Sequence, residues 1–201
     1  MADGNLQGPN KWRFDYCSKD LEELKRFEKS VYSIFSVKGK VRPCTTNKYG
    51  TMNYGVNCRP LAKTLFLIGV PFGNKVLKKY LIPKWILSDK ECFRVFAKRY
   101  IDCEGGVDLI NKAVSFEIYK STELVENSII FLNQFKKALK KYFGIKTLNP
   151  FKLSSKIKRK SGAFVQASRL RIKGKKELTR FYLKVGFDNK FKTEKLKLAI
   201  S

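Results

Sequence analysis

The chain has 201 residues, with 43 Lys plus Arg, 17 Asp plus Glu and no histidine, which gives a formal net charge of +26. The lack of histidine excludes Ser-His-Asp hydrolysis and His-ligated zinc or haem sites, so any chemistry must come from carboxylates, lysines and divalent metal. A hydrophobic content of 43% is enough for a folded core. A charge of +26 calls for a polyanionic partner, because a monomer carrying it alone would repel itself.

The positive charge is concentrated in the last third of the chain. Residues 136–201 contain 21 Lys or Arg and only three acids, Glu177, Asp188 and Glu194. The cations alternate with apolar residues, as in Arg169-Leu-Arg-Ile-Lys173, and do not form a separate charged tail. This pattern predicts folded elements with a basic face that binds phosphates.

Cysteine usage and hydropathy indicate the compartment. The five cysteines include no CxxC pair, which favours reduced thiols over a disulfide framework or a zinc ribbon. The first residues are polar, unlike those of a signal peptide. The longest apolar stretch, Leu65–Pro71, is too short to span a bilayer. We therefore expect a soluble cytoplasmic protein with no membrane partner.

Strand and helix patterns follow one another regularly along the first half. The predicted elements are a strand over 12–17, a helix from Ser18 as N-cap to Phe35, a hairpin of strands 37–43 and 53–58 around the turn 47–50, a helix over 59–68, and a helix over 89–103.

The same order recurs in the second half. The predicted elements are a strand over 114–119, a helix capped by Ser121 or Thr122 that reaches Tyr142 and ends at Gly144, two strands within 157–172, and a helix over 174–185. The spacing between matching positions grows by about 14 residues, which we place in the basic stretch 149–161. The pattern predicts a duplicated α+β unit with pseudo-twofold symmetry, with repeats at 1–88 and 89–201.

Each repeat begins with a carboxylate followed by glycine, Asp3-Gly4 and Glu104-Gly105. The second pair follows an amphipathic helix, and the glycine lets the chain turn sharply into the next strand. An acid is unfavourable at a helix C-terminus, because the helix dipole prefers a cation there. Duplication would bring the two carboxylates together, and Mg²⁺ is a divalent cation that such oxygen ligands hold.

Residues 96–105, Phe-Ala-Lys-Arg-Tyr-Ile-Asp-Cys-Glu-Gly, resemble the LAGLIDADG motif in its variant F-L-R-G-L-F-D-A-D-G. Residues 69–75 and Ile82-Pro-Lys-Trp-Ile86 are similar to the "GVP.G.K…IP.WI" stretch that precedes the second motif in intein- and archaeal-type members. Phe14–Leu24 resembles that family's first strand and the "S.D…L..F" that follows it. The resemblance to LAGLIDADG homing endonucleases covers nearly the whole chain in the family's order.

This resemblance implies two αββαββα repeats whose saddle-shaped antiparallel sheets lie along the major groove of double-stranded DNA. It also implies that Asp3 and Glu104 hold Mg²⁺ or another divalent cation at the scissile phosphates. The family places a lysine near each metal site. Lys78 or Lys79 fits that position in the first half, and Lys190 or Lys192 fits it in the second.

Basic residues on the predicted strands and in the loops beside them are the candidates for contacting phosphates or base edges. The candidates are Lys40, Arg42, Lys48, Lys158, Arg159, Lys160, Arg169, Arg171 and Lys173. Which of them face the groove depends on strand register, which sequence alone does not determine.

Two departures from the family pattern keep alternatives open. The first motif is reduced to Ala2-Asp3-Gly4 without its helix, so that helix either lies upstream or has been lost. Lys98 and Arg99 occupy positions where the motif has small residues. The alternatives to an endonuclease are a degenerate nucleic-acid-binding protein, either an RNA-splicing maturase or a DNA-binding regulator, and a basic ribosome-associated protein. The chain is expected to be a monomer, or a dimer formed through the exposed motif helix.

Overall fold

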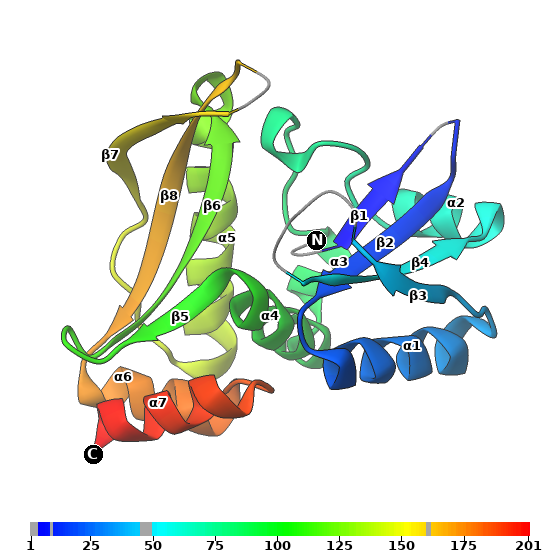
Figure 1. The fold of residues 1–201 in the computed structure, drawn as a ribbon. Helices are drawn as coiled ribbons and strands as arrows, with labels where there is room; N and C mark the ends of the chain where they lie inside the picture. The colour runs from blue at the N-terminus through cyan, green and yellow to red at the C-terminus, as the bar shows by residue number, and fades with distance from the viewer. Residues whose placement is uncertain (1–3, 9, 45–49, 160–161) are drawn as a thin grey trace. The chain divides into compact units, whose positions relative to one another are not determined.

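The computed structural model describes residues 4–8, 10–44, 50–159 and 162–201. Two compact units are present, the first ending at Asn74 and the second spanning Lys75–Ser201. Each unit contains one four-stranded antiparallel sheet with helices packed against it (Figure 1). The predicted architecture, an α+β fold with two pseudo-repeats, is confirmed. The repeat boundary at 88/89 stays a prediction, and residues 75–88 lie in the second unit.

The first unit has the sheet order β1-β2-β4-β3. Its elements are β1 (Gly4–Gln7), β2 (Arg13–Ser18), α1 (Leu21–Phe35), β3 (Lys40–Pro43), β4 (Met52–Asn57) and α2 (Arg59–Leu67). Alternate residues of β2 and β4, among them Phe14, Tyr54 and Val56, are buried against Leu24 and Val31 of α1. The opposite face of this sheet carries the other alternate residues, which are mostly polar.

The second unit has the equivalent order, β5-β6-β8-β7. Its elements are η1 (Lys75–Leu77), α3 (Lys84–Ser88), α4 (Lys90–Glu104), β5 (Gly105–Asp108), β6 (Ala113–Ser121), η2 (Thr122–Leu124), α5 (Val125–Phe143), β7 (Phe151–Lys158), β8 (Phe164–Lys173), α6 (Lys175–Lys184) and α7 (Lys190–Ile200). Helix α5 covers one face of β6 and β8 (Figure 1), and its Phe131, Leu132 and Phe135 are fully buried with Phe116 and Leu170.

Two predicted helix starts are wrong. Helix α1 is capped by Asp20 and not by Ser18, because the Asp20 carboxylate accepts hydrogen bonds from the backbone N–H groups of Glu22 (2.9 Å) and Glu23 (3.2 Å). After Ser121 the chain forms the 3-10 turn η2, so α5 begins at Val125 without a side-chain cap. The predicted end at Gly144 is confirmed, since this glycine has φ 67°, the left-handed conformation that stops helices.

Sheet register shows which residues of the two units are equivalent. Gly4 is the first residue of β1 and pairs with Tyr16, and Gly105 is the first residue of β5 and pairs with Phe116. Glu104 directly precedes Gly105, while Asp3, which precedes Gly4 in the sequence, lies outside the described residues.

The extra length of the second repeat is divided between two places. The difference in residue number between equivalent positions is 101 at Gly4 and Gly105. This difference is larger at the left-handed residues that end α1 and α5, and it is larger still at the equivalent positions of β4 and β8. Part of the extra length therefore lies in η2 and α5, and the basic stretch 149–161 accounts for only the remainder. The α5 segment enlarges the second unit's core, whereas β7 is mostly exposed.

Candidate nucleic-acid interface and motif site

One face of the second unit's sheet is not covered by α5, and we call it the second open face. Register pairs Glu117 of β6 with Arg169 of β8, and Ser115 with Arg171. The intervening residues, such as Phe116, are fully buried on the α5 side. Because side chains alternate along a strand, the two predicted arginines share the uncovered side of the sheet.

Carboxylates hold both arginines of the second open face in place. Arg169 Nε donates a 2.8 Å hydrogen bond to Glu117 Oε1, and Arg171 Nη2 lies 3.5 Å from Asp108 Oδ2. Each pair is about one-quarter exposed, and Arg171 Nε is buried without a hydrogen-bond partner in the described part of the chain. A guanidinium has five N–H donors, so each arginine keeps donors available for a ligand.

The other predicted nucleic-acid contacts of the second unit lie on different faces of its sheet. Lys173 continues the alternation of Arg169 and Arg171 and is exposed. The Arg159 guanidinium carbon lies 5.9 Å from the ring centroid of Tyr119, which belongs to the second open face. Lys158 pairs with Phe164, an alternate position of the opposite face. The remaining candidate, Lys160, lies outside the described residues.

The first unit also has an uncovered sheet face, which we call the first open face. Register pairs Lys40 with Gly55 and Arg42 with Asn53, at positions that alternate with the buried Tyr54. Lys40 and Arg42, both exposed, therefore lie on this face as the edge strand's two cations. Lys48 lies outside the described residues.

A buried ion pair occupies the centre of the first open face. Asp15 is only 5% exposed and accepts hydrogen bonds from Arg13 Nε at 2.7 Å and from Gln7 Nε2 at 3.0 Å. Gly55 leaves the space for this pair, since a Cβ there would lie 2.5 Å from Arg13 Nη2 and 2.8 Å from Asp15 Oδ1. The Arg13 charge is thus neutralised locally, so the available cations of this face stand at its edge.

Glu104 ends helix α4 and is half-buried beside two tyrosine side chains. Burial, assisted by the negative charge of Glu104, raises the pKa of Tyr80 to about 12. Burial also raises the pKa of Tyr100 well above its usual value, with Tyr80 and then Glu104 adding to the effect. The motif acid thus lies where an apolar core meets the sheet, while Asp3, its predicted counterpart, is outside the described residues.

Gly105 is required by close packing and not by an unusual backbone conformation. Its φ of −119° and ψ of 173° are extended, which corrects the expectation that glycine is needed for a sharp turn. A Cβ at this position would lie 2.7 Å from the Ile101 carbonyl oxygen and 3.0 Å from that of Ser115. The neighbouring Gly106 has nothing within 4 Å of such a Cβ.

Lys192, and not Lys190, reaches the end of the motif helix. Lys192 Nζ donates hydrogen bonds to the carbonyl oxygens of Asp102 and Gly105, the latter at 2.7 Å. The Asp102 carboxylate accepts from the Asp188 backbone N–H at 2.8 Å, which ties the start of α7 to the same helix end. Lys190 is the exposed first residue of α7. Lys192 is therefore engaged with the backbone at the end of α4, whereas Lys190 is exposed to solvent.

Near the two predicted lysines, Lys78 and Lys79, lies a buried cation that was not among the candidates, Lys120. Lys79 is exposed, and the half-buried Lys78 accepts a hydrogen bond through its carbonyl oxygen from Lys120 Nζ. Lys120 is 1% exposed, also donates to the Lys75 carbonyl at 2.6 Å, and lies 3.7 Å from the Tyr80 ring centroid. Burial, with a contribution from the Lys75 charge, lowers the pKa of Lys120 to about 8.

A sequence signal for Lys120 existed. It follows Val114, Phe116 and Ile118 at the apolar positions of the same alternating strand, where a lysine is out of place unless it has buried partners.

Glu104 is the described motif acid that could hold a divalent cation. Glu104 supplies one hard carboxylate, and Mg²⁺ is usually held by one or two carboxylates completed by phosphate oxygens and water. Across residues 4–8, 10–44, 50–159 and 162–201, no group of three or more His, Cys, Asp or Glu residues is arranged around a common point. Glu104 fits the role of a single protein ligand.

Lys98 and Arg99, the two large residues in the motif, have a local partner. Lys98 Nζ lies 2.5 Å from Asp188 Oδ1, and Arg99 Nη1 lies 3.0 Å from Asp188 Oδ2. The buried face of α4 is formed instead by residues such as Phe93, Ala97 and Tyr100, which pack in the second unit's own core.

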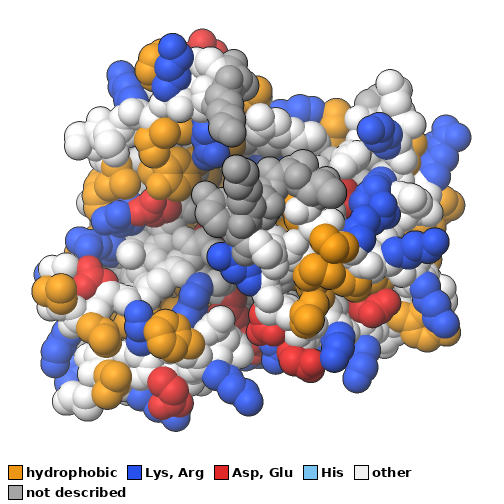
Figure 2. Space-filling view, in the orientation of Figure 1, with side chains coloured by type: hydrophobic (Ala, Val, Ile, Leu, Met, Phe, Trp, Pro, Cys, Tyr) orange, Lys and Arg blue, Asp and Glu red, His pale blue; other side chains and the backbone are white. Residues whose placement is uncertain are grey.

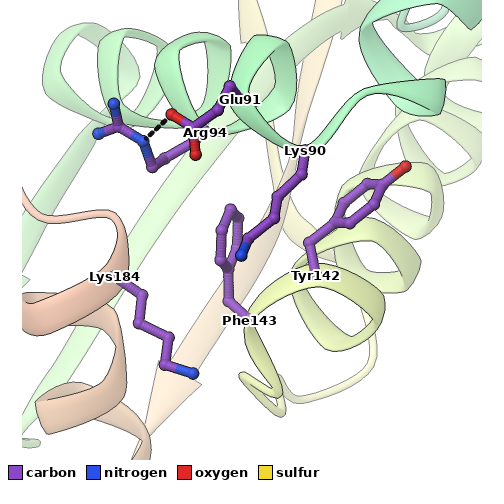
Figure 3. Close-up of a pocket in the computed structure, with 6 residues that line it drawn as sticks. All are labelled: Lys90, Glu91, Arg94, Tyr142, Phe143 and Lys184. Carbon is purple, nitrogen blue, oxygen red and sulfur yellow. Dashed lines mark hydrogen bonds and ion pairs between the residues drawn. The ribbon is translucent and has the colours of Figure 1, made fainter.

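A hollow of about 240 Å³ lies at the opposite end of α4 from Glu104 (Figure 3). It is lined by Lys90, Glu91, Arg94, Tyr142, Phe143 and Lys184. Arg94 Nε donates a hydrogen bond to Glu91 Oε2 at 2.7 Å, so one of the three cations that line the hollow is already paired with an acid.

The surface agrees with the composition. Figure 2 shows Lys and Arg side chains over much of the visible surface of each unit, with smaller groups of acids between them. None of the five cysteines, all of which lie in the described part of the chain, forms a disulfide. In the part of the chain that the structure describes, no helix combines the length and apolar character needed to cross a membrane.

The comparisons with known proteins rest on structure alone, because no family model and no curated protein matches the chain. A mesophilic variant of the homing endonuclease I-DmoI superposes with a TM-score of 0.58 at 13% identity, covering 98% of this chain and 91% of that one. I-DmoI in complex with DNA and Ca gives 0.53 at 12% identity, covering 87% and 74%. The homing endonuclease I-WcaI bound to its DNA recognition sequence gives 0.52 at 12%, covering 97% and 80%.

A full-length DUF199/WhiA protein from Thermatoga maritima superposes with a TM-score of 0.55 at 13% identity. The alignment covers 99% of this chain but only 55% of that protein, so the chain spans about half of its length. The N-terminal LAGLIDADG domain of DUF199/WhiA is also similar, at 14% identity and a TM-score of 0.50. These likenesses show that the chain has the fold shared by LAGLIDADG homing endonucleases and the WhiA domain.

Proposed function

We propose that the chain binds double-stranded DNA through its two open faces and cleaves phosphodiester bonds at Asp3 and Glu104. The observation that carries this proposal is the register, because it assigns Lys40 and Arg42 to one uncovered sheet face and Arg169 and Arg171 to the other. Structures of proteins with this fold have been solved with DNA bound. The net charge of +26 suits the DNA backbone, whose phosphates release counterions when cations bind.

In this proposal each group of residues has a distinct task. The edge cations of the open faces bind phosphates and fix the register of the protein on the duplex. Asp3 and Glu104 hold Mg²⁺ or a similar divalent cation, which when bound stabilises negative charge on the phosphoryl oxygens. Lys192 positions the Glu104 end of α4 through the Asp102 and Gly105 carbonyls. Lys78, Lys79 and Lys190 remain candidates for contacting the phosphate.

The first test separates DNA binding from cleavage. A target is selected from a pool of random duplexes and then inserted into a supercoiled plasmid, which is incubated with the chain and Mg²⁺ or Mn²⁺. We expect nicking or linearisation, which Asp3→Asn and Glu104→Gln abolish while the affinity for the duplex in Ca²⁺ stays within about threefold. Loss of binding in both acid variants would contradict the assignment of these residues to catalysis.

A DNA-binding protein that does not cleave is the second candidate. It is favoured by Lys98 and Arg99, which occupy the motif's small-residue positions and are paired with Asp188 in their own unit. It predicts binding that falls steeply with salt and is indifferent to divalent metal and to both acid substitutions. Plasmid that stays intact with every metal, together with tight duplex binding, would establish this function. Preference for a structured RNA over the duplex would instead support a maturase.

A further inference from the structure

The two open faces differ in chemistry at equivalent positions. Gly4 and Gly105 mark the same place in the two repeats, so the strand pairings give a matched set of positions. The pair Cys17 and Asn53 of the first unit matches the pair Glu117 and Arg169 of the second. The pair Arg13 and Asn57 likewise matches the pair Ala113 and Lys173. At two matched positions on the inner strand β4 or β8, the first unit therefore carries asparagine and the second carries a cation.

The first open face presents amides on the edge strand β1 and the inner strand β4. Asn5 of β1 and Asn57 of β4 are exposed, and Asn53, also on β4, pairs with Arg42 of the edge strand β3. The Asn53 Oδ1 atom is buried and has no hydrogen-bond partner among the described residues, so the exposed amides of Asn5 and Asn57 are the ones accessible to a base. A carboxamide matches adenine, because it can donate to N7 and accept from the N6 amino group together.

The second open face presents guanidinium, ammonium and carboxylate groups. Arg169 and Arg171 lie in line with Lys173, and each arginine is oriented by an acid, Glu117 or Asp108. Arginine or lysine matches the O6 and N7 acceptors of guanine, and a carboxylate accepts from the N4 amino group of cytosine. The ion pairs leave guanidinium donors unused while restricting the rotation of each side chain.

From this contrast we infer that the two units read different base pairs, with the first open face selecting A·T and the second selecting G·C. The inference rests on the proposed binding of double-stranded DNA. It makes the preferred target asymmetric, with one A·T-rich segment and one G·C-rich segment. Because the matched positions are Asn53 with Arg169 and Asn57 with Lys173, single substitutions can transfer the preference of one face to the other.

The experiment is selection of bound sequences from a pool of random duplexes at one fixed salt concentration, followed by competition assays. We expect the wild type to select a site with one A·T-rich and one G·C-rich segment. Arg169→Asn is expected to lower discrimination for guanine about tenfold in the G·C-rich segment only. Asn57→Lys, at an exposed position that tolerates a longer side chain, is expected to replace adenine by guanine preference in the A·T-rich segment only.

The matched control is Lys152→Asn, which removes one cation from β7. Lys152 pairs with Ser168 and is bonded to Glu126 of α5, on the covered side of the sheet. It is expected to change the salt dependence slightly and the selected bases not at all. Duplex binding with the same base composition in both segments would overturn the inference and leave the proposed function intact. A chain that binds no duplex would overturn both.

Discussion

Lys120 shows how a single side chain can hold a connecting segment. Its ammonium group is enclosed by β6, two carbonyls of residues 75–78 and the Tyr80 ring. An ammonium in such a place loses its hydration and is retained only because carbonyl oxygens and a π face replace water. The cost appears as the lowered pKa of Lys120, about 8 against 10.5 for an unperturbed lysine.

This pKa predicts an unusual dependence of stability on pH. Because the folded pKa of Lys120 lies below the unfolded value, unfolding takes up a proton between about pH 8 and 10.5, and stability therefore rises with pH. From pH 7.5 to 9.5 we expect the free energy of unfolding of the wild type to gain about 2 kcal/mol relative to Lys120→Met. Urea denaturation at both pH values measures this, with Lys137→Met of the exposed side of α5 as the control. A constant difference between wild type and Lys120→Met would contradict it.

Lys192 and Lys190 stand two residues apart and should behave differently. Lys192 Nζ binds two carbonyl oxygens at the end of α4, where a cation also complements the helix dipole. Lys192→Met is expected to lower the free energy of unfolding by about 2 kcal/mol, the usual value for a charge-assisted hydrogen bond. Lys190→Met, at the exposed start of α7, should change it by less than about 0.5 kcal/mol. Equal effects in chemical denaturation would remove Lys192 from its positioning role.

At the scale of the element, the passage from α4 to β5 depends on one glycine and not on its neighbour. A Cβ at Gly105 would overlap the Ile101 and Ser115 carbonyl oxygens, which are backbone atoms that cannot turn aside. We expect Gly105→Ala to lower the free energy of unfolding by about 1–3 kcal/mol through overpacking. Gly106→Ala has open space around it and is the matched control. Thermal melting of both variants tests this prediction, and an unchanged melting temperature for Gly105→Ala would refute it.

The sequence predicts the long elements well because their patterns are strong. Helix α5 repeats apolar residues at helical spacing up to Gly144, and the core residues of β6 alternate. The four-residue strands β1 and β5 are too short for any pattern, and α7 has only two buried residues, so none of these three elements could be predicted. The start of α1 is ambiguous in the sequence because two good capping residues, Ser18 and Asp20, stand close together.

The candidate site was predictable in kind but not in detail. The motif resemblance indicated Glu104, and the basic residues on the strands were the candidates for contacting a nucleic acid. Register decides that Arg169 lies on the open face and Lys158 on the other, and register depends on pairings between distant strands. The choice between Lys190 and Lys192 likewise depends on how α7 begins, which only tertiary contacts determine.

At the scale of the whole molecule, the two units have separate cores of unequal size. Among the described residues, the first core contains eight buried apolar residues, while the second brings together residues from α4, α5, α6, α7 and both inner strands. Burial of apolar surface is the main stabilising contribution, so we expect the first unit to unfold at lower urea than the second. Trp12 lies in the first unit and Trp85 in the second. Fluorescence of Trp85→Phe and Trp12→Phe then reports each unit separately, and coincident midpoints would contradict the expectation.

The contacts of Lys120 with the Lys75 and Lys78 carbonyls and the Tyr80 ring, here called the Lys120 clamp, also determine where one repeat of this protein can be exchanged for another. The carbonyls of Lys75 and Lys78 belong to the chain leading into α3, yet their partner is on β6. A chimera that joins a foreign first repeat at position 88 would replace the segment that places those carbonyls and the Tyr80 ring around the buried Lys120 ammonium group. A fusion made directly after Asn74 carries the clamp intact, so the boundary useful for exchanging repeats lies 14 residues before the one that repeat matching places at 88.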